Sequence, residues 1–130
     1  MQPNTMEQER RRYFRVNPAI SQPVLTFIHN DAVDWQSLPV KDISLGGMAF
    51  YPPQASQPPA VGTAIANLQL MLPNLGVISP IGVVRRIERE SKQNKLVCAL
   101  EFTNLNDEDD HKLYQYLNNR QRELHLMTKN

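Results

Sequence analysis

Two short segments carry side chains suited to binding an anionic ligand. The segment Arg11–Arg15 (RRYFR) places two arginines four positions apart, and the segment Asp42–Gly47 (DISLGG) holds a carboxylate, a hydroxyl and two glycines. Arginine presents a planar fork of donors that fits a phosphate. A carboxylate accepts hydrogen bonds, a hydroxyl can donate one, and glycine leaves the main chain unshielded by side chains. The two segments therefore predict a site for a phosphate-bearing purine.

The spacing within each segment is compatible with ligand binding but also with purely structural roles. Arg11 and Arg15 project to the same side whether the chain is helical or extended. Ser44 can donate to a phosphate or orient its own loop, and Asp42 and Ser44 can also cap backbone groups of a glycine-containing turn. The arginine spacing alone is weak evidence, because it recurs at residues 85 and 89.

Length and composition limit the class of protein. The 130 residues suffice for one domain, and the formal net charge of +1 gives no field that would attract a nucleic-acid backbone. Four arginines between positions 10 and 15 make the charge local, which favours a small anionic ligand over DNA or RNA. A single-strand RNA binder is a weaker alternative, since no strand carries an array of aromatic residues. Cys98 is the only cysteine, and the absence of an apolar leader or span predicts a cytoplasmic protein.

The elements that must position these residues are mostly strands. Alternating apolar patterns bounded by turn residues predict six strands, and a turn at Asn30-Asp31 follows the first of them. Proline at position 39 predicts an edge or a bulge, and residues 52–59 form a proline-rich loop. The predicted strands cover residues 23–29, 32–43, 47–51, 64–72, 77–88 and 95–102. In the fifth of them, Arg85 and Arg86 should lie on opposite sides.

A helix follows the last strand. The apolar residues Leu113, Tyr116, Leu117 and Leu124 recur at helical spacing, and Asn106 is placed to cap the helix N-terminus. Short strands followed by one amphipathic helix predict a mainly β fold, a small antiparallel barrel or curled sheet that the helix covers.

This order of parts resembles the PilZ domain, a family of bacterial receptors for cyclic di-GMP. The family motif R-x-x-x-R matches Arg11 and Arg15, and D/N-x-S-x-x-G matches Asp42, Ser44 and Gly47. The tail of the chain looks most similar to the PilZ domains of flagellar-brake proteins. One departure lies in the family's G-x-E-F strand, where this chain has Ala99.

The resemblance implies a six-stranded PilZ-type barrel with a C-terminal helix and a flexible N-terminal arm. We expect the arm over residues 1–9, a single domain over 10–126 with its helix at about 106–126, and a tail over 127–130. The implied function is a cyclic di-GMP receptor that orders its arginine arm over the ligand and signals to a protein partner in motility, biofilm or exopolysaccharide control. The alternative is a PilZ-like interaction module of a pilus or motor complex that binds no ligand.

The binding residues that this interpretation assigns are Arg10, Arg11, Arg15, Asp42, Ser44, Gly46 and Gly47. In the family, a basic residue at the position of Arg10 accompanies a stacked pair of cyclic di-GMP molecules, although a solvated charge is the simpler reading of it. Without a G-x-S-x-G turn or a phosphate-binding loop ending in lysine, we expect no enzyme and no catalytic cofactor. We also expect a monomer or a weak dimer with no membrane span.

Several other residues have ordinary explanations. We expect Tyr13, Phe14 and Trp35 to pack rather than stack on a ligand. The basic residues of the fifth strand either extend the basic face or form a solvated strand edge, which we favour; they are Arg85, Arg86 and Arg89. The histidines are scattered without metal-ligand spacing, so we expect no metal site.

Overall fold

The strands of this protein turn alternate side chains toward a common core. In β5 (Asn67–Leu72), Leu68, Leu70 and Leu72 are buried while the residues between them are exposed. The computed structural model describes residues 14–128. Within them, eight strands form one antiparallel sheet in the order β4-β7-β8-β3-β2-β1-β5-β6. The other elements are β1 (Leu25–His29), β2 (Asp34–Ser44), β3 (Gly47–Phe50), β4 (Ala64–Ile65), β6 (Gly76–Ile78), β7 (Ile81–Arg89), β8 (Leu96–Asn104) and α2 (Asp107–Thr128).

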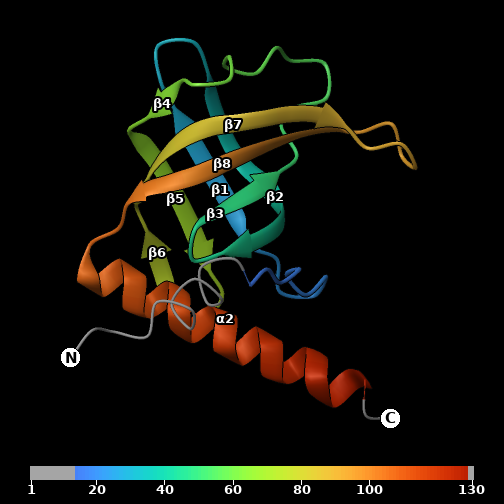
Figure 1. Cartoon of the computed structure of the whole chain (residues 1–130), viewed down its shortest axis with the longest axis vertical. Coiled ribbons are helices and arrows are strands. Elements are labelled where there is room, and N and C mark those ends of the chain that lie inside the picture. Colours follow the sequence, from blue (N-terminus) through green and yellow to red (C-terminus); the bar gives the residue numbers. More distant parts are fainter. Residues whose placement is uncertain (1–13, 129–130) are drawn as a thin grey trace, which may run out of the picture.

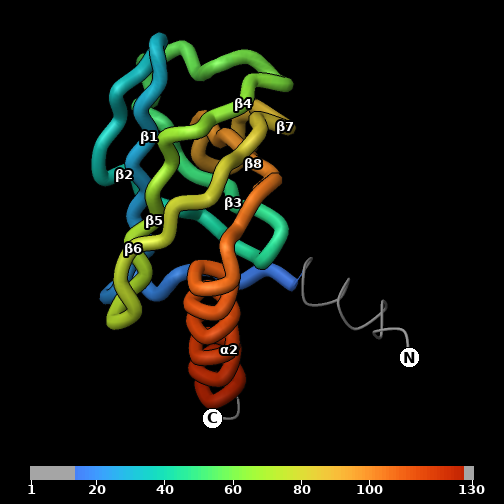
Figure 2. The backbone as a smooth tube through the Cα atoms, turned by 90° about the vertical axis from the view of Figure 1, so that its left-hand side faces the viewer, coloured from blue at the N-terminus to red at the C-terminus, as the bar shows by residue number. Residues whose placement is uncertain are grey.

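The sheet curls so that its two halves face each other across the core. In Figure 1, β7, β8 and β3 cross in front of β1 and β5, and the view in Figure 2 shows the two layers from the side. The long strand β2 belongs to both layers, because its first half pairs with β1 and its second half with β3. Pro39 lies at this changeover, and the pairing is irregular on both sides of it. The bulge expected there is present, although β2 is not an edge strand.

The expected class is confirmed, a mainly β antiparallel fold with one C-terminal helix, but the predicted count of six strands is wrong. Two predicted strands each divide in two, the first at Ala66 into β4 and β5 and the second at Ser79-Pro80 into β6 and β7. Pro80 has no N–H to donate to a ladder. At each break the chain changes partners: β4 pairs with β7 but β5 with β1, and β6 pairs with β5 but β7 with β8. The breaks therefore let the chain pass from one layer to the other.

The C-terminal helix covers the end of the curled sheet, as its apolar stripe predicts. The Asn106 side chain accepts from the N–H of Asp109 at 2.7 Å, which is the expected N-cap. Leu113, Tyr116 and Leu117 are buried in the same core as the strands. The helix ends at Thr128, two residues beyond the expected boundary. Among residues 14–128 there is no helix of the length and apolar character that crossing a membrane requires.

One glycine allows an unusually close approach between two strands. Gly47 opens β3 and lies opposite Glu101 of β8. A Cβ atom at Gly47 would lie 2.2 Å from the main-chain oxygen of Leu100, far inside van der Waals contact. Because that oxygen belongs to the backbone of a central strand, it has little freedom to move aside. Any other residue at position 47 must therefore separate β3 from β8.

We predict that Gly47→Ala lowers the free energy of unfolding by about 1–3 kcal/mol or more, the range of overpacking in a filled interior. Chemical denaturation of the two proteins measures the loss. Gly82→Ala is the matched control, because Gly82 is also a strand glycine but its closest neighbour, at 3.2 Å, is a methyl group of the Leu68 side chain. Equal losses for the two variants would contradict the backbone clash.

Candidate functional site

The two motifs singled out in the sequence meet in the structure through an ion pair. The segment before β1 forms an antiparallel bridge with the end of β2, in which Val16 and Ile43 exchange two backbone hydrogen bonds of 3.0 Å. This bridge places Arg15 beside Asp42, and Arg15 Nη1 donates to Asp42 Oδ1 at 2.7 Å. The side chains are 46% and 21% exposed, so the pair lies at the surface. The guanidinium keeps further donors open to solvent.

Further contacts fix the backbone that carries Arg15. The side-chain amide of Asn17 donates from Nδ2 to the main-chain carbonyl of Lys41 at 3.1 Å. Nε of Arg120, on α2, donates to the main-chain carbonyl of Asn17 at 2.7 Å. Arg120 is itself buried, and its Nη1 lies 3.2 Å from the carboxylate of Glu123. The start of the described chain is therefore held by both the sheet and the helix.

Ser44 shapes the turn between β2 and β3. Its side chain is buried, its Oγ accepts from the N–H of Gly46 at 3.1 Å, and it lies 3.4 Å from the carbonyl of Gly47. The carbonyl of Gly46 accepts from the N–H of Phe102 at 2.8 Å, which ties the turn to β8. The local capping considered from the sequence thus applies to Ser44, whereas Asp42 pairs with Arg15.

A hollow of about 260 Å³ opens beside this turn. Its residues come from the segment before β1, the β2–β3 turn, β7 and β8, which the sheet order brings together. They are Arg15, Ser44, Gly46, Arg85, Arg86, Ala99, Leu100 and Glu101. A larger hollow of about 430 Å³ lies on β1, β2 and β5 and contains none of the predicted site residues. The chemistry for binding an anion is therefore concentrated in the smaller hollow.

The far wall of the hollow corrects one prediction. Arg85 and Arg86 were expected on opposite sides of their strand, yet both are exposed and both line the hollow. The reason is a β-bulge: Val84 pairs with Leu100 and Arg86 pairs with Ala99, so Arg85 is an extra residue in β7. No turn residue or glycine marks this bulge in the sequence, although two adjacent arginines in a strand with one buried face suggest one.

The floor of the hollow is apolar and chemically inert. Ala99 replaces the glycine of the family pattern and faces the hollow with a single methyl group. The neighbouring Cys98 points to the core, where burial raises the pKa of its thiol to about 11. The thiol therefore stays protonated at neutral pH and is no nucleophile. No cluster of acidic, cysteine and histidine side chains suited to a metal ion occurs in the part of the chain that the structure describes.

The remaining predicted residues divide into three groups. Arg10, Arg11 and Tyr13 lie outside the described residues, as does the proposed arm over 1–9. Trp35 packs on the core as expected, with its ring 6.3 Å from that of Phe50 in an edge-on contact.

For three further residues, the structure differs from the expectation or adds to it. Phe14 is 38% exposed and is not a core residue. Gly47 is buried and meets a steric need of the sheet, while Gly46 lines the hollow.

This chain is similar to known proteins in both sequence and fold. The chain is similar to the flagellar brake protein YcgR of Methylibium petroleiphilum, with 31% identity over 127 residues. The similar region covers 92% of this chain but 54% of that protein, so the chain spans about half the length of its relative.

Solved structures share the fold. The inhibitor of motility MotI/DgrA of Bacillus subtilis superposes with a TM-score of 0.73 at 26% identity, over 88% of this chain and 52% of that one. The PilZ domain of Escherichia coli YcgR, solved with c-di-GMP, gives a TM-score of 0.74 at 19% identity, over 93% of this chain and 98% of that one. The family model for the PilZ domain matches residues 9–119. The chain therefore belongs to the PilZ domain family.

Proposed function

We propose that this protein is a receptor for cyclic di-GMP that controls motility or biofilm formation through a protein partner, and that it does not transform its ligand. The observation that carries the proposal is the 2.7 Å pair between Arg15 and Asp42 at the edge of a hollow with three arginines. The solved PilZ domain of E. coli YcgR contains c-di-GMP, and its fold is the fold of this chain.

The residues of the hollow suit a guanylate. The remaining donors of the Arg15 guanidinium can bind a phosphate oxygen or guanine O6, and Asp42 can accept from the guanine N1–H and amino groups. Because Asp42 already holds Arg15 in place, the guanidinium loses less conformational freedom when the ligand binds. Ser44 and Gly46 act by fixing the turn beside the ligand rather than through reactive chemistry.

Arg10 and Arg11 complete the proposed site from the segment that precedes Arg15. A guanidinium at each position adds a bidentate partner for phosphate or guanine, and a pair of stacked ligands offers more of these groups than two arginines can bind. We propose that binding draws this segment over the hollow. Such a change can signal to a partner only through contacts that differ between the free and bound states.

We predict that Arg15→Ala weakens binding of cyclic di-GMP by about 2–5 kcal/mol, the cost of removing one partner of a charge-assisted pair. Isothermal titration calorimetry on the intact protein measures it. The fold should persist, because surface ion pairs contribute only about 0–1 kcal/mol to stability. Arg122→Ala, which removes an exposed arginine of α2 away from the hollow, is the control and should bind as the wild type does.

Two outcomes would reject the proposed function. The wild type could show no heat and no chemical-shift change with cyclic di-GMP, which would favour a ligand-independent interaction module. It could instead bind a poly-uridine oligomer in preference to cyclic di-GMP, which would favour the RNA-binding alternative.

We predict that cyclic di-GMP slows amide hydrogen exchange across residues 1–14, because the added ligand contacts protect backbone groups of the arginine segment. Exchange detected by mass spectrometry, with and without ligand, tests this at peptide resolution. The C-terminal half of α2 is the internal reference and should be unaffected. Unchanged exchange across residues 1–14 would reject the proposed ordering of this segment, although the protein could still bind cyclic di-GMP.

We predict a stoichiometry of two cyclic di-GMP molecules per protomer, falling to one in Arg10→Ala. The physical reason is that the second ligand needs the additional guanidinium. Calorimetry at concentrations well above the dissociation constant gives the ratio. A ratio of one for the wild type would exclude the stacked pair.

A further inference from the structure

The far wall of the hollow carries a second arginine–carboxylate pair. Arg85 Nη2 lies 3.2 Å from Glu101 Oε1, and the two side chains are 54% and 42% exposed. An ion pair this exposed contributes little to stability, so the fold does not account for its position. Both residues line the same hollow as Arg15.

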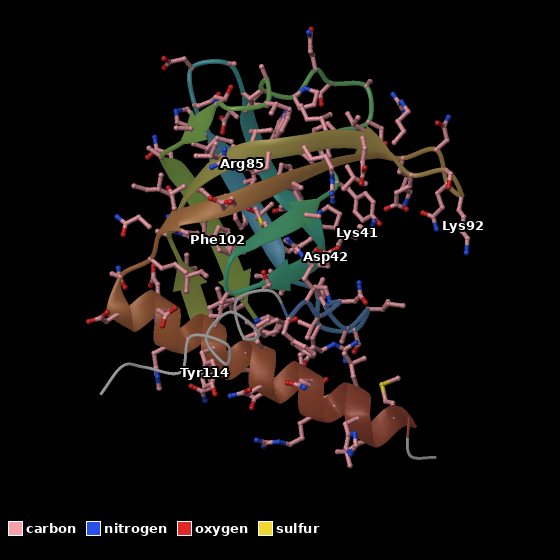
Figure 3. All side chains as sticks on the ribbon, viewed as in Figure 1. Lys41, Asp42, Arg85, Lys92, Phe102 and Tyr114 are labelled. Carbon is pink, nitrogen blue, oxygen red and sulfur yellow. The ribbon has the colours of Figure 1, made fainter. Side chains whose placement is uncertain are left out.

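The two pairs have the same chemistry and lie on opposite sides of the hollow. Asp42 belongs to β2 and Arg85 to β7, and the sheet order places β3 and β8 between them. Figure 3 labels Asp42 and Arg85 on these two strands. Each pair offers guanidinium donors next to carboxylate acceptors. The hollow is thus bounded by two similar sets of groups.

The bulge in β7 makes this arrangement possible. Without the extra residue, strict alternation would turn either Arg85 or Arg86 toward the core. With it, Arg85 and Arg86 both line the hollow, and Arg86 Nε lies 3.4 Å from the carboxylate of the exposed Glu88. Between the walls, Ala99 fills little of the hollow because its side chain is a single methyl group. A flat base can therefore lie against β8 between the two pairs.

A guanine edge complements an arginine beside a carboxylate. Guanine presents the O6 acceptor next to the N1–H and amino donors, which match a guanidinium and a carboxylate in the same order. Adenine presents an amino donor where guanine has O6, and its N1 is an acceptor. An adenine at this wall would therefore set donor against donor and acceptor against acceptor, which leaves polar groups unpaired.

We propose that Arg85 and Glu101 form a second guanine-reading subsite, and that Arg86 binds the phosphate of the same guanylate unit. This inference rests on the proposed function, since it assigns the second half of a ligand with two guanylate units. The Arg15–Asp42 pair binds one guanylate unit and the Arg85–Glu101 pair binds the other. The subsite selects guanine over adenine.

The test compares single variants in calorimetry with cyclic di-GMP and cyclic di-AMP, using the full chain. Arg85→Ala and Glu101→Gln should each weaken the binding of cyclic di-GMP by about tenfold or more, the contribution of one good base contact. Glu101→Gln should also narrow the preference for cyclic di-GMP over cyclic di-AMP, a change that a purely structural role would not produce. Arg85→Lys keeps the charge but loses the planar fork, so it should restore binding only in part.

Arg89→Ala is the matched control. Arg89 lies on the same strand but outside the hollow, where its Nη1 donates to the carbonyl of Asn94 at 3.1 Å. This variant should bind within about twofold of the wild type, since exposed contacts of this kind contribute little. Thermal unfolding of each variant confirms that the fold is retained.

The outcomes separate this inference from the function on which it rests. Suppose that the wild type binds cyclic di-GMP and Arg15→Ala does not. If Arg85→Ala and Glu101→Gln then bind as tightly as Arg89→Ala, the second subsite is rejected and the receptor function stands. If the wild type shows no binding of cyclic di-GMP, both are rejected. Loss of affinity with an unchanged base preference in Glu101→Gln would overturn the guanine-reading role.

Discussion

The close contact between Gly47 and the main-chain oxygen of Leu100 sets the geometry of the candidate site. It lets the start of β3 lie directly against β8, and the bond from the Phe102 N–H to the Gly46 carbonyl holds the preceding turn to the same strand. The β2–β3 turn and the floor of the hollow on β8 are therefore held together by the pairing of β3 with β8. The bridge between Val16 and Ile43 connects the segment of Arg15 to β2, which pairs with β3. A shift of β3 would therefore move Arg15 as well.

Rigidity and freedom are distributed unevenly in the hollow. Ser44 is buried and its hydroxyl is used within the turn, so the backbone of the turn has a fixed shape. Arg15 and Arg85 are half exposed, and each guanidinium has more donors than its ion pair with a carboxylate uses. Their carboxylate partners orient them without adding much stability. Since the net charge of the chain is +1, the attraction for an anion is local and depends on the direction of these donors.

The PilZ unit contains the whole hollow within one curled sheet. The chain spans about half of its YcgR relative, yet the separate E. coli PilZ domain matches it over nearly its full length. The lining residues come from β2, the β2–β3 turn, β7, β8 and the segment before β1. The helix contributes indirectly, because Arg120 holds the carbonyl of Asn17 and so fixes the backbone beside Arg15.

Much of the fold could be predicted from the sequence because it depends on interactions between residues close together in the chain. Helical spacing and the Asn106 cap predicted α2, because capping and an apolar stripe act over a few residues. The hairpin turns and the two family motifs could be recognised for the same reason, since each is confined to a few residues. The strand count was not, because the breaks at Ala66 and Pro80 arise where the curled sheet forces the chain to change layers.

The sequence by itself determined which residue types are available for binding, a mainly β unit and its terminal helix. Only the tertiary structure decided which residues meet. Arg15 and Asp42 are far apart in the chain, and their contact depends on a bridge between segments that no local propensity specifies. Arg85 and Arg86 share one face because of a bulge set by the register of β7 against β8, and register is fixed only when the whole sheet packs on its core.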